Sequence, residues 1–177
     1  MLNSAPRFKL AFNEGEIRHW AARNRDEKYK KALAAGKRLS GGRYNRRDFD
    51  DIIEWKAPGR IRHLIKQNTD GEIADALELA VAAKKERSSV AVLTGLSGVS
   101  VPVASALLAM LRPSRATIID YRALRSVGCS RASTSVNIPL YLQYVRFCRK
   151  VARAAGVDLR TLDRALWQYD KERHPSD

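Results

Sequence analysis

The chain of 177 residues carries 33 lysines and arginines against 19 aspartates and glutamates, a net charge of +14. The length predicts one domain over 1–177, a hydrophobic fraction of 45% excludes a wholly disordered chain, and no run approaches the roughly 18 apolar residues of a membrane span. With no secretory signal pattern and only two cysteines, we expect a reduced, cytoplasmic protein without a disulfide framework or a four-cysteine metal cluster.

The periodicity of apolar residues predicts an all-α protein, with no convincing strand. Asn45, Thr69 or Asp70, Asp120 and Asp158 are the candidate N-caps, because short polar side chains there can accept a bond from the first helical turn. We predict helices over 14–35, 45–56, 58–67, 72–86, 89–96, 101–112, 121–127, 138–155 and 159–172, followed by a tail at 173–177.

The basic residues are unevenly distributed along the sequence. From Arg87 to Val157 there are ten basic residues and one acid, Asp120. Such a stretch is typical of contact with a polyanion or an anionic membrane surface, and a basic solubility coat is the alternative. Because most acids lie elsewhere, this part of the chain is the better candidate for a phosphate-facing surface.

A polar break between two apolar helices, LTGLSGVSVPVA (93–104), is the most informative local pattern. Glycine allows a positive φ and lets the backbone approach a ligand closely. The helix that starts near Ser100 would present free N–H groups and a positive dipole end to a phosphate. The region 88–112 resembles the helix-hairpin-helix motif, whose hairpin reads L-P-G-V-G-x-x-x-A. The matching residues are Leu96, Ser97, Gly98, Val99, Ser100 and Ala104, with Ser100 replacing the second glycine.

The segment IIDYRALRSVG (118–128) opens 14 residues after Ala104. It resembles the V-D-x-x-V-x-R segment that follows the hairpin in the helix-hairpin-helix base-excision DNA glycosylases. The resemblance implies a short, divergent member of that superfamily, of bacterial or phage-defence type, and places Asp120 on the catalytic aspartate. Bifunctional members carry a lysine nucleophile 18 or 19 residues earlier. Pro102 stands 18 residues before Asp120 and cannot form a Schiff base, which predicts a monofunctional enzyme without lyase activity.

The chemistry of base removal suits a fixed carboxylate. Breaking an N-glycosidic bond builds positive charge on the sugar, which Asp120 would stabilise while orienting a water. A plain helix cap is the alternative role for Asp120. No iron–sulfur cluster or other cofactor is expected, and a monovalent cation at the hairpin would be compatible with the family.

Further site residues are candidates on weaker grounds. The hairpin residues expected to grip the DNA backbone are Gly95, Ser97, Gly98, Ser100 and Val101. Arginines flanking the hairpin and Asp120 are the expected phosphate contacts: Arg112, Arg115, Arg122, Arg125 and Arg131. A base outside the stack is usually held by aromatic groups. The candidates for that pocket are Tyr44, Trp55, Lys56 and Tyr121, each of which could equally be structural.

Three functions therefore remain open. The first is a DNA glycosylase that removes a damaged or modified base, for example a hypermodified cytosine of phage DNA. The second is a non-catalytic helix-hairpin-helix module that binds double-stranded DNA in a repair or defence complex. The third is a helical protein–protein adaptor whose basicity is incidental. No membrane partner is expected.

Overall fold

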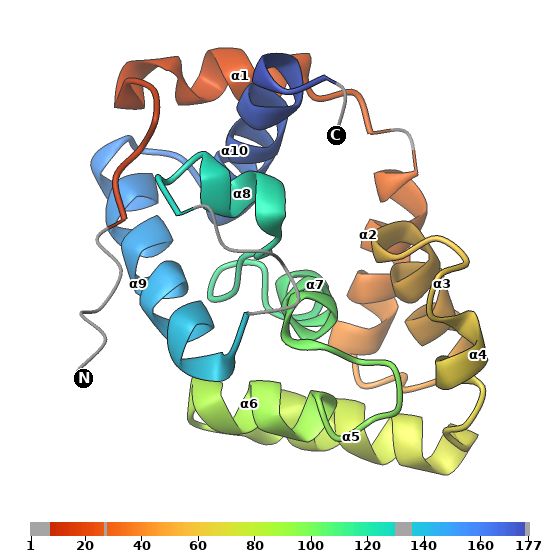
Figure 1. Ribbon diagram of the computed structural model, residues 1–177. Helices are drawn as coiled ribbons and strands as arrows, with labels where there is room; N and C mark the ends of the chain where they lie inside the picture. The colour runs from red at the N-terminus through yellow and green to blue at the C-terminus, as the bar shows by residue number, and fades with distance from the viewer. Residues whose placement is uncertain (1–7, 27, 130–135, 176–177) are drawn as a thin grey trace, which may run out of the picture. The chain divides into compact units, whose positions relative to one another are not determined.

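The computed structural model describes residues 8–26, 28–129 and 136–175. Within these ranges the chain forms ten α-helices and one short 3-10 helix and contains no strand (Figure 1). The prediction of an all-α chain is confirmed. None of the described helices is long and apolar enough to cross a membrane.

The described helices divide into two compact units. The first unit holds the described residues up to Arg25 and those from Ile118 onward, and the second runs over Asp26–Thr117. The first contains η1 (Glu14–Glu16), α1 (Ile17–Arg23), α8 (Tyr121–Arg125), α9 (Ile138–Ala154) and α10 (Leu159–Arg173). The second contains α2 (Tyr29–Ser40), α3 (Arg46–Lys56), α4 (Arg62–Ile65), α5 (Asp70–Ala82), α6 (Glu86–Leu93) and α7 (Val101–Leu111).

Each unit has its own apolar core. In the first, α1 and α8 pack against α10, and α9 contributes the fully buried side chains of Tyr141 and Tyr144. In the second, α2 packs against α3 and α7, and α5 packs against α6. Every residue of α7 is buried, because small and aliphatic side chains cover all its faces.

The predicted N-caps are correct. Asn45 accepts a hydrogen bond from the Asp48 N–H, Asp120 from Ala123 and Asp158 from Thr161. Thr69, rather than Asp70, caps α5 and forms a reciprocal capping box with Glu72. The start of α7 at Val101 also matches the prediction.

Four predicted helices are wrong in extent. The 89–96 helix lies at Glu86–Leu93. The helix predicted over 14–35 ends at Arg23, because Asn24 has an extended backbone, and α2 then starts at Tyr29 and continues to Ser40. The 58–67 helix shrinks to the single turn of α4, since Gly59 has a φ of +67°. The helix predicted over 72–86 runs from Asp70 to Ala82, and Ala83 leaves the helical conformation with a ψ of 125°.

Candidate functional site

The predicted site residues fall into two groups, one in each unit. We call residues 94–100, between α6 and α7, the 94–100 turn, and residues 118–128 the Asp120 segment. The turn belongs to the second unit and the Asp120 segment to the first, and each is described by itself.

Gly98 gives the 94–100 turn its shape. Its φ is +81°, and a Cβ placed on it would lie 2.9 Å from the Leu64 Cβ and 3.2 Å from the Ile65 Cδ1. Both the backbone conformation and the lack of space therefore require glycine. Gly95 has no positive φ, and a Cβ placed on it would lie 3.1 Å from the carbonyl oxygen of Val92 and 4.0 Å from that of Ala91.

The side chain of Asn68 holds the same turn through hydrogen bonds to the backbone of the turn. The side-chain oxygen of Asn68 accepts from the Ser97 N–H at 2.8 Å, and its amide nitrogen donates to the Ser97 carbonyl at 3.1 Å and to that of Ile65 at 3.0 Å. Arg46 donates to the Asn68 carbonyl and to the Asp70 carboxylate. Sequence reasoning missed Asn68, because its partner is 29 residues away and no local pattern connects the two.

The turn leads directly into the first turn of α7. Ser100 is the N-cap and is exposed, and its side chain makes no capping bond to any described residue. The first hydrogen bond of α7 joins the Ala104 N–H to the Ser100 carbonyl at 2.8 Å. The N–H groups of Val101 and Val103 come before it and have no acceptor within the helix. Pro102 has no N–H group to offer.

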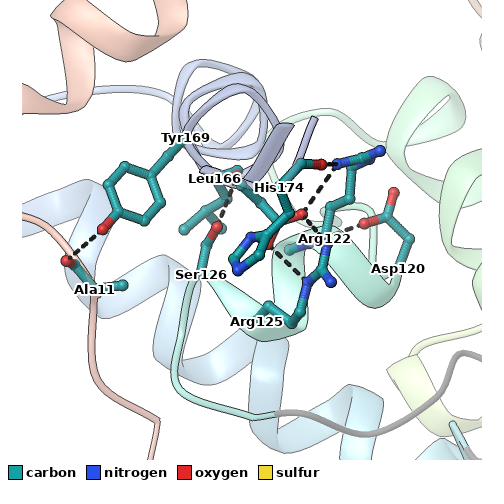
Figure 2. A network of polar contacts seen from close by, with 10 residues as sticks. Ala11, Asp120, Arg122, Arg125, Ser126, Leu166, Tyr169 and His174 are labelled. Atoms are coloured by element: carbon teal, nitrogen blue, oxygen red, sulfur yellow. Dashed lines mark hydrogen bonds and ion pairs between the residues drawn. The ribbon is translucent and has the colours of Figure 1, made fainter. Parts of the chain in front are cut away.

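Asp120 is fixed at the start of α8 (Figure 2). One carboxylate oxygen accepts from the Ala123 N–H at 2.9 Å, and its own carbonyl accepts from the Leu124 N–H at the same distance. The residue is half-buried, whereas Ile119 before it and Leu124 after it are fully buried. The carboxylate thus has a defined direction and sits at the positive end of a helix turn.

The two arginines after Asp120 are held by a buried carboxylate on α10 (Figure 2). Asp170, which is 1% exposed, accepts from Arg122 Nη1 at 3.2 Å and from Arg125 Nε and Nη2 at 2.8 and 2.6 Å. His174 Nδ1 lies 3.2 Å from the same carboxylate. The side chain of Arg122 is 8% exposed and that of Arg125 is 25% exposed, so Arg122 is the more deeply buried of the two. Sequence reasoning missed Asp170.

Tyr121 is the exposed aromatic residue of the Asp120 segment. It is 37% exposed, and the guanidinium groups of Arg122 and Arg125 lie 5.1 and 5.3 Å from its ring centre. The same two arginines that bind Asp170 therefore also contact the ring of Tyr121, the residue directly after Asp120.

The other predicted site residues have varied surroundings in the second unit. Trp55 donates its indole N–H to Asp26 at 2.7 Å and packs on the ring of Tyr29, which makes it a structural anchor. Tyr44 and Lys56 are half-buried, at the two ends of the segment that carries α3. Arg115 is exposed. Arg131 lies outside the described residues.

Arg112, directly after α7, forms hydrogen bonds within the protein, to the end of α5 and to α6. It donates to the Ala83 carbonyl and to Ser89 Oγ at 3.2–3.3 Å, and its pKa is lowered chiefly by burial.

In the described ranges no three His, Cys, Asp or Glu side chains come together as a metal site. No family model, curated protein or solved structure matches this chain.

Proposed function

We propose that the chain is a monofunctional DNA N-glycosylase, which hydrolyses the bond between a damaged or modified base and its sugar and leaves an abasic site. The observation that carries this proposal is the fixed, half-buried carboxylate of Asp120 at the N-terminus of α8. It is the one acid in a long basic stretch of sequence, which is where a polyanionic substrate would bind.

The proposed reaction needs little beyond this carboxylate. As the N-glycosidic bond breaks, its electron pair leaves with the base and positive charge develops at C1′ of the sugar. The Asp120 carboxylate stabilises that charge and orients a water, whose oxygen bonds to C1′ while one of its protons ends on the released base. The backbone bond from Ala123 keeps the carboxylate in place before the charge develops.

The 94–100 turn supports the second part of the proposal, DNA binding. The resemblance to a helix-hairpin-helix motif assigns this turn to the phosphate backbone. Gly98 at φ +81° and an exposed Ser100 before the first turn of α7 suit that role. Tyr121, exposed and held by two arginines, is the best-placed candidate for contact with an extruded base.

A non-catalytic DNA-binding module is the second candidate. Asp120 already has a structural task as the cap of α8, and this task alone would account for an aspartate at that position. In that case the basic stretch and the turn would still bind DNA, and no base would be released.

A panel of duplexes tests the proposal. Each duplex carries one damaged or hypermodified base, including bases from phage DNA, and alkali after incubation reveals abasic sites. We expect cleavage of at least one duplex by the wild type and none by Asp120→Asn, with binding retained by both. Binding that weakens with salt, without cleavage of any duplex, would leave the binding module. Failure to bind at any salt concentration would favour the adaptor.

A further inference from the structure

The longest described helix, α9, has one strongly basic face. Its four cations are Arg146, Arg149, Lys150 and Arg153, at the i, i+3, i+4 and i+7 spacing that places side chains on one side of a helix. Arg146, Lys150 and Arg153 are exposed, and Arg149 is half-buried. The 17 residues of α9 include no aspartate or glutamate.

The opposite face of α9 is already covered by the protein. Its buried residues are Leu140, Tyr141, Tyr144, Val145, Cys148, Val151 and Ala152. The ring of Phe8 packs at 5.9 Å from that of Tyr144 and at 5.6 Å from that of Phe147. A basic amphipathic helix that binds a lipid surface must insert its apolar face. This apolar face serves the core of the first unit, which leaves only the charged side for a partner.

We infer that the exposed cations of α9 form a phosphate-binding face for duplex DNA, additional to the 94–100 turn. From Arg146 to Arg153 the helix rises roughly 10 Å, and over that length one DNA strand presents about three phosphates. Three exposed cations therefore match the charge density of one strand. The identity of the polyanion rests on the proposed function, whereas the basic face itself does not.

A salt titration with matched variants tests this inference. Fluorescence anisotropy measures binding of the full chain to an unmodified duplex at several salt concentrations. The test variant is Arg146→Gln/Lys150→Gln/Arg153→Gln. The control variant is Lys37→Gln/Lys84→Gln/Lys85→Gln, which removes the same charge from three exposed residues of the second unit that lie outside the Arg87–Val157 stretch. Thermal unfolding checks that both variants fold.

In the α9 variant the slope of log K against log [salt] should be smaller in magnitude by about 2 to 3. The variant should also bind DNA roughly tenfold to a hundredfold more weakly near 0.1 M salt. The control should retain the slope of the wild type. Equal losses in both variants, or none in the α9 variant, would overturn the inference while leaving DNA binding intact. Preference of the α9 face for phosphatidylserine vesicles over DNA would also overturn it. Absence of duplex binding by the wild type would instead refute the proposed function.

Discussion

The 94–100 turn and the Asp120 segment are held in place by different kinds of interaction. The turn depends on shape and backbone bonds: a glycine with a positive φ lies against Leu64, and a neutral amide of Asn68 clamps Ser97. The Asp120 segment depends on charge, since a buried carboxylate on α10 holds Arg122 and Arg125. Added volume should therefore damage the turn, and lost charge should damage the Asp120 segment.

The largest expected effect comes from Asp170→Ala. This change removes the buried carboxylate that Arg122 and Arg125 share, and we expect it to lower the free energy of unfolding by about 3–5 kcal/mol. Urea denaturation measures it. The matched control is Glu172→Ala, which breaks the more exposed pair between Arg23 and Glu172 and should shift the midpoint much less. Equal shifts in the two variants would refute the charge-based account of the Asp120 segment.

Gly98→Ala should cost about 2 kcal/mol or more. At this position alanine would have to adopt a left-handed backbone conformation, which it disfavours. Its methyl group would also lie only 2.9 Å from the Leu64 Cβ. Gly71→Ala in α5 is the control, because no atom lies within 4 Å of the added Cβ, and that variant should be stabilised slightly. If thermal unfolding ranks the two variants alike, shape does not determine the turn.

Asn68→Ala should cost about 1–3 kcal/mol, since it leaves the Ser97 N–H and carbonyl without their side-chain partner. Amide hydrogen exchange localises the effect, and we expect faster exchange at Ser97 in the variant. Unchanged exchange there would show that the clamp does not hold the turn.

The smallest effect concerns the pKa of Glu172, which hydrogen bonds from Arg23 and Gln168 lower from 4.5 to about 2. Because the pKa is depressed in the folded state, this pair stabilises the fold above about pH 4.5 and its contribution is lost as the pH falls towards 2. NMR titration of the Glu172 carboxyl should show the low pKa, and Arg23→Gln should raise it. A pKa near 4.5 in the wild type would contradict this.

The sequence predicts local features of this chain well and distant ones poorly. Asn45, Asp120 and Asp158 were identifiable as caps because each side chain and its backbone donor are three residues apart. The two contacts that fix the candidate site were not identifiable. Asn68 meets Ser97 across 29 residues, and Asp170 meets Arg122 across 48. Such pairs follow from packing, which no local spacing encodes.

The central claim is that the charge of Asp120, and not its capping bond, is needed for chemistry. Asparagine caps a helix about as well as aspartate, so Asp120→Asn removes the charge and keeps the fold. Asp158→Asn is the matched control, because Asp158 caps α10 of the same unit with the same kind of bond, to Thr161.

Single-turnover release of the base from the duplex cleaved by the wild type is the most direct measurement. The account predicts that Asp120→Asn slows release by at least about a hundredfold and that Asp158→Asn matches the wild type. Equal rates for Asp120→Asn and Asp158→Asn would contradict it and leave Asp120 as a helix cap.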